Sequence, residues 1–187
     1  MNASVLVVSG WREVGKTALC RKLVEMGWAL RLDIAGLLSP ARFAASSEAG
    51  KPLVKTGIEV EDLRTGQRRL LASCLENELH GSQLGPWTFD DHVMDWGNEV
   101  LKAATPCDML VIDELGPFEF DLKHGWSIGF ELIDRQDYRL AVIVIRPEYL
   151  EQFQQRWPEA REISLVESMD TTSIAKQVFA RVWGNTL

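Results

Sequence analysis

Residues 10–17 read Gly10-Trp11-Arg12-Glu13-Val14-Gly15-Lys16-Thr17, a complete G-x-x-x-x-G-K-[ST] pattern. The run before it, residues 5–9, is continuously apolar and rich in valine, which is typical of a strand buried on both faces of a parallel sheet. The residues after it, 16–26, repeat leucine and methionine at helical spacing, and Gly27 is the expected end of that helix. A strand, a glycine-bearing loop and a helix in this order open an α/β unit.

This loop is suited to binding phosphate. Its backbone N–H groups and the positive end of the following helix converge on phosphate oxygens. We expect Lys16 to reach the β- and γ-phosphates as a catalytic residue, and the Thr17 hydroxyl to be a ligand of Mg²⁺. The predicted nucleotide-binding residues are Gly10, Trp11, Arg12, Glu13, Val14, Gly15, Lys16, Thr17 and Ala18.

A second motif supplies carboxylates. Residues 109–114 read Met-Leu-Val-Ile-Asp-Glu, an apolar strand that ends in two acids. Asp113 is expected to hold Mg²⁺, as in a Walker B motif. Glu114, directly after it, is positioned to polarise an attacking water, which indicates hydrolysis. Beside a complete phosphate loop, this reading is favoured over a merely solvated strand end.

The remaining pattern predicts further α/β units around a β insertion. Residues 28–73 read as the insertion, with strands at 35–39, 58–63 and 69–72 and a hairpin tip at 46–51. We then expect strands at 108–113, 140–145 and 163–166, and helices at 90–104, 126–133, 149–157 and 171–183. Because no linker or repeat interrupts the chain, residues 1–187 are predicted to form a single domain.

Composition limits the partners. The chain has 20 Lys and Arg against 27 Asp and Glu, a formal net charge of −7. This acidity argues against nucleic acid or an anionic membrane as a partner, but not against one phosphorylated small molecule. Three dispersed cysteines without CxxC spacing favour a reducing compartment, and no run is long enough to span a membrane. We therefore expect a cytoplasmic protein; its protein partners are not predicted.

The phosphate loop, the Asp113-Glu114-Leu115-Gly116-Pro117-Phe118-Glu119 block and residues 57–66 together resemble the small P-loop nucleoside triphosphatases, which include the thermophilic and cancer-related nucleoside triphosphatases. The resemblance covers most of the chain in the same order. It implies a three-layer fold with a mainly parallel, RecA-like sheet. It also implies Mg²⁺-dependent hydrolysis of ATP, GTP and other nucleoside triphosphates to diphosphates. In three places the sequence departs from the family pattern: Pro117 stands where the family has lysine, residues 166–170 lack an Asn-Arg pair, and the loop carries Trp11, Arg12 and Glu13.

Several other residues have two interpretations. Arg146 and Arg42 are each either a γ-phosphate contact or, as the favoured interpretation, a surface arginine. Trp11 either stacks on a base or partner, or covers the underside of the loop. Glu119 is expected to brace the Asp113-Glu114 loop, with a role near the metal as the alternative, and His124 to lie in a surface turn. Trp96, Trp157 and Trp183 are expected in the core.

Two other functions use the same loop. A kinase would transfer the γ-phosphoryl group to a nucleotide or small metabolite, but residues 42–56 lack the arginine-rich lid that such enzymes normally carry. A nucleotide-binding adaptor, comparable to the P-loop accessory proteins of molybdenum-cofactor maturation, would bind nucleotide tightly with negligible turnover. Hydrolysis is the leading prediction because Glu114 follows Asp113.

Overall fold

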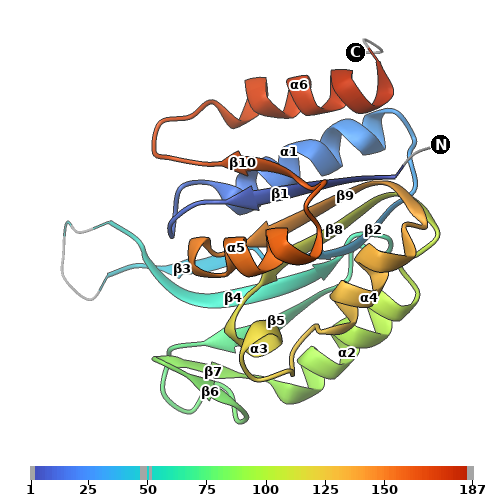
Figure 1. Ribbon diagram of the computed structural model, residues 1–187. Coiled ribbons are helices and arrows are strands. Elements are labelled where there is room, and N and C mark those ends of the chain that lie inside the picture. Colours follow the sequence, from blue (N-terminus) through green and yellow to red (C-terminus); the bar gives the residue numbers. More distant parts are fainter. Residues whose placement is uncertain (1–2, 47–49, 51, 185–187) are drawn as a thin grey trace.

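The strands form one twisted sheet between two layers of helices (Figure 1). The structure, a computed structural model, describes residues 3–46, 50 and 52–184. Its strands are β1 (Ser4–Ser9), β2 (Ile34–Leu38), β3 (Ala41–Ala44), β4 (Val54–Asp62), β5 (Arg68–Ser73), β6 (Gln83–Leu84), β7 (Trp87–Phe89), β8 (Cys107–Leu115), β9 (Tyr138–Ile145) and β10 (Arg161–Ser164). Its helices are α1 (Lys16–Ala29), α2 (Asp91–Lys102), α3 (Pro117–Phe120), α4 (Ile128–Arg135), α5 (Pro147–Arg156) and α6 (Thr171–Trp183).

Five strands make a parallel half-sheet in the order β10-β1-β9-β8-β2. β9 lies between β1 and β8, with Val142 opposite both Leu6 and Val111. A strand therefore separates the phosphate-loop strand from the strand that carries Asp113, which is the RecA-like order. The predicted α/β class with a mainly parallel sheet is confirmed.

The other strands are antiparallel and extend the sheet beyond β2 in the order β4-β5-β7-β6, with β3 pairing the free end of β4. The predicted antiparallel insertion is present, but its bounds differ from 28–73. β2 belongs to the parallel half because it pairs with β8, and the antiparallel strands run from Ala41 to Phe89. The predicted hairpin tip at 46–51 lies mostly outside the described residues.

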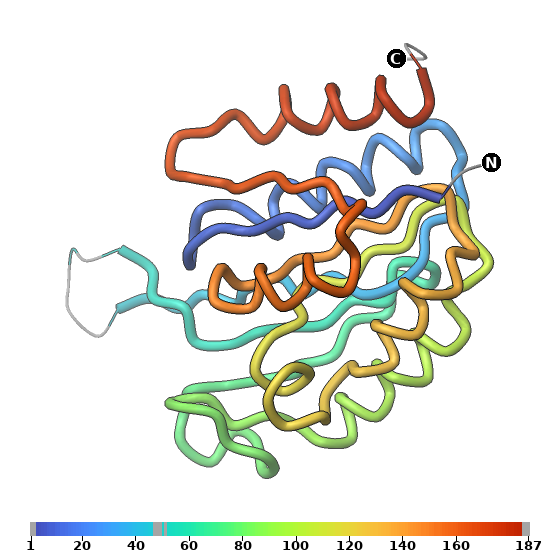
Figure 2. The backbone as a smooth tube through the Cα atoms, viewed as in Figure 1, coloured from blue at the N-terminus to red at the C-terminus, as the bar shows by residue number. Residues whose placement is uncertain are grey.

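Each face of the sheet has its own core. α1 and α6 cover one face, and α2, α4 and α5 cover the other, an arrangement that the backbone trace also shows (Figure 2). Side chains of β1 alternate between them: Val5 and Val7 pack with the α2 side, and Leu6 and Val8 with the α1 side. Burial on both faces explains why this strand is apolar at four consecutive positions, Val5 to Val8.

Local signals predicted most elements, but several differ from the prediction. α1 continues to Ala29 rather than stopping at Gly27. Gly27 instead allows close packing, since a Cβ there would lie 2.3 Å from Ile34 Cδ1. β8 is longer than 108–113, β4 begins at Val54 rather than at residue 58, and the last strand is Arg161–Ser164 rather than 163–166. The strands β3, β6 and β7 and the short helix α3 were not predicted, since each is too short to show a period. Asp90 caps α2: its carboxylate accepts the N–H of His92 and Val93.

Candidate active site

The predicted site residues meet at one edge of the sheet. β1, β8 and β9 are parallel, so the loop after β1, the acids at the end of β8 and the residue after β9 all emerge at the same edge, on the left in Figure 1. In open α/β sheets this carboxyl edge is where ligands bind. The topology thus brings together Thr17, Asp113, Glu114 and Arg146, which are distant in the sequence.

The loop begins at a tightly enclosed glycine. Gly10 has a φ of +143°, and a Cβ there would lie 2.5 Å from the carbonyl oxygen of Leu165, which follows β10. The N–H of Leu165 in turn donates to Ser9 O at 2.7 Å. Only glycine fits this close approach, so the start of the loop is fixed against the strand on its other side.

Lys16 lies across the loop. Its ammonium donates to the carbonyl oxygens of Gly10, at 2.7 Å, and Trp11, at 2.8 Å. Burial lowers the pKa of Lys16, while the negative charges of Glu114 and Asp113 act in the opposite direction. A partly desolvated cation between the loop and two carboxylates is suited to binding phosphate oxygens.

The first turn of α1 has main-chain N–H groups that can donate hydrogen bonds to a ligand. Gly15 is its N-cap, and among the described residues no side chain caps the helix and no acid occupies its first turn. The first N–H groups of a helix have no partner within it, and the helix dipole makes this end positive. The half-buried Thr17 and the exposed Ala18 lie in this first turn, as predicted for a phosphate site.

Asp113 is the buried acid of the site, with 2% of its surface exposed. Its carboxylate accepts the N–H of Ser39 at 3.1 Å and the side-chain hydrogen bond of Thr17. Burial raises its pKa to about 6. The two residues predicted to hold the metal are therefore in contact.

This pair fits Mg²⁺, which commonly uses one carboxylate, phosphate oxygens and several waters. Among the described residues, no group of three or more His, Cys, Asp or Glu could hold a metal ion, so phosphate and water would supply most ligands. A carboxylate and a hydroxyl beside a phosphate loop are the donor set that such a site needs.

Glu114 is held by Arg146. The Nε of Arg146 donates to Glu114 Oε1, and both side chains are about one-third exposed or less. Arg146 is thus a half-buried residue paired with Glu114, and its contact with the γ-phosphate stays a prediction. The signal was invisible in the sequence because it depends on β8 and β9 being neighbours, which places the residues after both strands side by side.

Glu119 braces the turn that follows β8. One carboxylate oxygen accepts the N–H of Gly116 at 2.8 Å, and the other accepts the N–H of Trp126 at 2.7 Å. Burial raises the pKa of Glu119 to about 7, against the effect of these hydrogen bonds. The predicted bracing role is confirmed, and the brace connects the active-site turn to the segment leading into α4.

The other residues with two interpretations, and the tryptophans expected in the core, lie in different parts of the molecule. Trp11 is 73% exposed, so the interpretation that it covers the underside of the loop is wrong. Arg42 forms an ion pair with Glu78. His124 is exposed and its ring approaches Phe118 edge-on. Trp157 is buried, and Trp96 and Trp183 pack against the two cores.

Lys55 on β4 is half-buried, and its Nζ lies 5.4 Å from the centre of the Trp87 ring. Burial lowers the pKa of Lys55, while the negative charges of Glu114 and Glu13 act in the opposite direction. No sequence motif marks it, because a lysine in an alternating antiparallel strand has the appearance of an ordinary solvent-facing residue.

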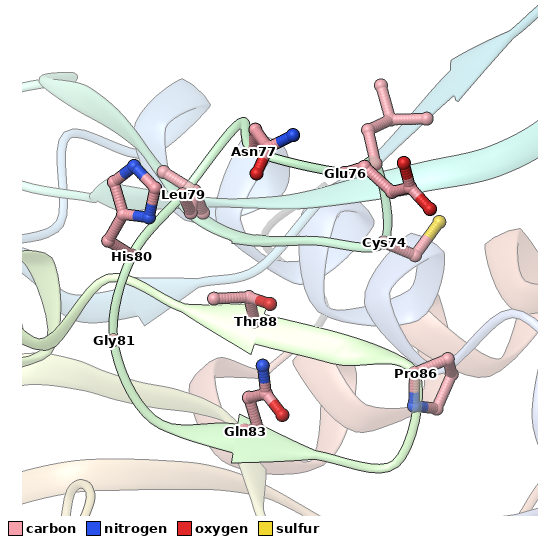
Figure 3. A pocket seen from close by; sticks show the side chains of 10 residues that line it. Cys74, Glu76, Asn77, Leu79, His80, Gly81, Gln83, Pro86 and Thr88 are labelled. Atoms are coloured by element: carbon pink, nitrogen blue, oxygen red, sulfur yellow. The ribbon is translucent and has the colours of Figure 1, made fainter.

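A pocket of about 510 Å³ lies beyond the end of β5 (Figure 3). It adjoins β4, because the Sγ of Cys74 lies 3.7 Å from the carbonyl oxygen of Lys55. The predicted site residues are not among those that line it. The lining comes from one segment: Cys74, Leu75, Glu76, Asn77, Leu79, His80, Gly81, Gln83, Pro86 and Thr88.

None of the helices in the described part of the chain has the length and apolarity needed to cross a membrane.

Curated proteins named nucleoside-triphosphatase THEP1 are similar to this chain in sequence. The chain is 29% identical over 117 residues to the nucleoside-triphosphatase THEP1 of Pyrobaculum aerophilum, covering 63% of this chain and 60% of that protein. It is 27% identical over 115 residues to the protein of the same name from Methanopyrus kandleri, covering 61% and 58%. The match thus spans about three fifths of the length of these relatives.

Solved structures share the fold. The solution structure of a human cancer-related nucleoside triphosphatase has a TM-score of 0.66 at 17% identity, covering 99% of this chain and 100% of that chain. The crystal structure of THEP1 from the hyperthermophile Aquifex aeolicus has a TM-score of 0.63 at 17% identity, covering 96% and 99%. The sequence model of the family described as "NTPase" matches residues 5–177. Since this match includes the loop after β1, the acids at the end of β8 and almost all of the sheet, the chain belongs to the NTPase family.

Proposed function

We propose that this protein is a Mg²⁺-dependent nucleoside triphosphatase that converts ATP, GTP and other nucleoside triphosphates to the diphosphate and phosphate. The observation that carries the proposal is the convergence, at one sheet edge, of the phosphate loop, the Thr17–Asp113 contact and the Glu114–Arg146 pair. The names of the curated relatives support the same activity.

Each residue of the site has a distinct role in binding or catalysis. The loop N–H groups and Lys16 bind the phosphates, and Thr17 and Asp113 hold the metal. When bound, Mg²⁺ would neutralise part of the negative charge of the phosphates. Glu114 accepts a proton from water, whose oxygen bonds to the γ-phosphorus. The bond from that phosphorus to the β–γ bridging oxygen breaks, and the diphosphate leaves with the electron pair.

Arg146 has two consequences for this chemistry. Its hydrogen bond fixes the orientation of Glu114, so that the carboxylate does not need to be ordered during the reaction. Its positive charge lies near the position where negative charge develops on the transferred group. We assign Arg146 to the γ-phosphate end of the site and leave Arg42, which pairs with Glu78, outside it.

The test is phosphate release from ATP and GTP with and without Mg²⁺, in the natural protein and in Glu114→Gln. We expect the variant to lose at least about a hundredfold in kcat, the typical contribution of a positioned general base. Glu99→Gln is the matched control, because Glu99 is exposed on α2 and pairs only with Lys102 among the described residues. Undiminished release by Glu114→Gln would remove Glu114 from the mechanism.

The same assay separates the rival functions. Tight nucleotide binding with no phosphate release would indicate an adaptor. Release that appears only with an added acceptor, together with a phosphorylated product, would indicate a kinase. Release that depends on Mg²⁺ and Glu114 in water alone supports the hydrolase.

A further inference from the structure

Ser39 carries a buried hydroxyl group beside the proposed metal site. It directly follows β2, and its main-chain N–H donates to Asp113 Oδ2 at 3.1 Å. The Oγ of a serine lies no more than about 4 Å from the nitrogen of the same residue, because three covalent bonds join the two atoms. In any rotamer, the Ser39 Oγ therefore lies within about 7 Å of the Asp113 carboxylate.

The register of the sheet also places Ser39 level with Glu114. β2 and β8 are parallel, and Leu37 on β2 is opposite Ile112 on β8. Two residues further along each strand, at the edge where the phosphate loop also emerges, are Ser39 and Glu114. Ser39 thus lies next to both acids, on the opposite side of β8 from β9 and Arg146.

The Ser39 hydroxyl has no hydrogen-bond partner among the described residues, although its oxygen is buried. The Asp113 carboxylate accepts the N–H of Ser39 and the hydroxyl of Thr17 instead. The next residue, Pro40, has no N–H that could donate to the Ser39 oxygen. A buried hydroxyl without a partner costs free energy, so native proteins pair nearly all such groups with protein, water or a ligand.

A hydrated Mg²⁺ ion matches this hydroxyl. Mg²⁺ gives up its waters reluctantly and is held by one or two carboxylates together with phosphate oxygens, so several coordinated waters remain. Each of these waters needs an acceptor for its hydrogen atoms, and a hydroxyl oxygen has two lone pairs. Thr17 and Asp113 are expected to bind the ion directly, and Ser39 lies one residue's width further from it.

We propose that the Ser39 hydroxyl accepts a hydrogen bond from a water molecule on Mg²⁺ and thereby positions the hydrated metal against Asp113. The inference rests on the proposed function for the presence of Mg²⁺ in the site. Ser39 is a positioning residue, because it touches neither the metal nor the reacting atoms. Its hydroxyl gains a partner in the metal complex, so it stabilises that complex rather than the fold.

The first test is equilibrium binding of a non-hydrolysable β,γ-imido triphosphate, in Mg²⁺ and in EDTA. The ratio of the two affinities measures the contribution of the metal. Ser39→Ala is expected to reduce this ratio about fivefold, the effect of one lost hydrogen bond, and to change the affinity in EDTA less than about twofold. Ser39→Thr keeps a hydroxyl and is expected to retain most of the ratio. The control is Ser127→Ala, whose natural hydroxyl donates to His124 O at 2.6 Å in the turn before α4; it is expected to bind as the natural chain does.

The second test is thermal unfolding without nucleotide or metal. Ser39→Ala removes a hydroxyl that has no protein partner, so Tm is expected to stay the same or to rise. Ser73→Ala is the matched comparison, because Ser73 is fully buried and its hydroxyl bonds to Thr56 O at 3.3 Å and to Glu78. Loss of these bonds is expected to lower Tm by about 2–4 °C.

Three results would overturn the assignment. An unchanged Mg²⁺-to-EDTA ratio in Ser39→Ala would place the hydroxyl away from the metal, and equal losses in both conditions would assign it to the protein or the phosphates. A fall in Tm like that of Ser73→Ala would show that the hydroxyl stabilises the fold. Should Ser39→Ala not fold, Ser39→Cys provides the same comparison, because a thiol hydrogen-bonds only weakly. Since binding needs no turnover, a natural chain without phosphate release would refute the hydrolase, while a selective loss of the Mg²⁺ contribution would still support Ser39.

Discussion

Glu119 holds a buried carboxyl group between two main-chain donors, with 5% of the residue exposed. Its pKa is about 7 in the folded protein, whereas an unfolded glutamate titrates near its ordinary value of 4.5. Between these two values the folded state binds the proton and the unfolded state does not. Stability from this group is therefore complete below about pH 4.5 and is lost as the pH rises through about 7.

We expect the natural protein to lose stability relative to Glu119→Gln across this window, by up to about 1.4 kcal/mol per pH unit. Urea unfolding of both proteins at pH 5 and pH 8 measures the difference. At either pH, Glu119→Gln is also expected to lower the free energy of unfolding by about 1–3 kcal/mol. The reason is that its amide oxygen accepts only one of the two N–H groups without rearrangement. A stability difference that does not change with pH would show that Glu119 titrates alike in both states.

At the scale of the element, the pairing of β2 with β8 aligns the Ser39 N–H with Asp113. Gly36 makes this pairing possible: its φ is +105°, and a Cβ there would lie 2.0 Å from the carbonyl oxygen of Val111. Gly36→Ala is expected to lower the free energy of unfolding by about 3 kcal/mol or more, from backbone strain and the clash together.

The matched control is Gly66→Ala. Gly66 also has a positive φ, +73°, but a Cβ there would meet no atom within 4 Å. Gly66→Ala is expected to lower the free energy of unfolding by only about 1 kcal/mol, through backbone strain alone. Urea midpoints of the two variants measure the difference, which isolates the contact with β8. Equal losses of stability in the two variants would mean that β8 shifts at Val111 to accommodate the new Cβ at no cost in free energy.

At the scale of the whole molecule, ligand binding adds to the stability of the fold. A nucleoside triphosphate at about 100 times its Kd contributes about 2.7 kcal/mol, which for a chain of this size raises Tm by about 5–10 °C. We expect Mg²⁺ to enlarge the rise in the natural protein and in Asp95→Asn, where an exposed acid on α2 is changed. In Asp113→Asn the Mg²⁺-dependent part should vanish.

Thermal unfolding with the β,γ-imido triphosphate, in Mg²⁺ and then in EDTA, measures this effect. A metal-dependent rise that survives in Asp113→Asn would place the metal elsewhere. The net charge of −7 does not prevent this binding, because Lys16 at the start of α1 and Arg146 after β9 supply positive charge locally at the site.

Local signals in the sequence predicted the parts of the molecule that depend on neighbours along the chain. The phosphate loop and the brace from Glu119 to Gly116 each join residues only a few positions apart. The strand order and the roles that follow from it could not be read in the same way. Arg146 meets Glu114 across 32 positions, a contact that exists only because β8 and β9 are neighbours. A charged residue that looked solvated in the sequence thus pairs with the predicted general base.

The position of β9 between β1 and β8 has a consequence for how the protein is made. A nascent chain that has emerged only as far as α4 already contains the loop and both acids, yet lacks the strand that sets the spacing between them. The polyphosphate-binding geometry therefore arises late in synthesis, when Tyr138–Ile145 enters the gap. Nucleotide capture thus marks the completion of the central sheet, and an incomplete chain leaving the ribosome has no assembled site with which to sequester nucleotide.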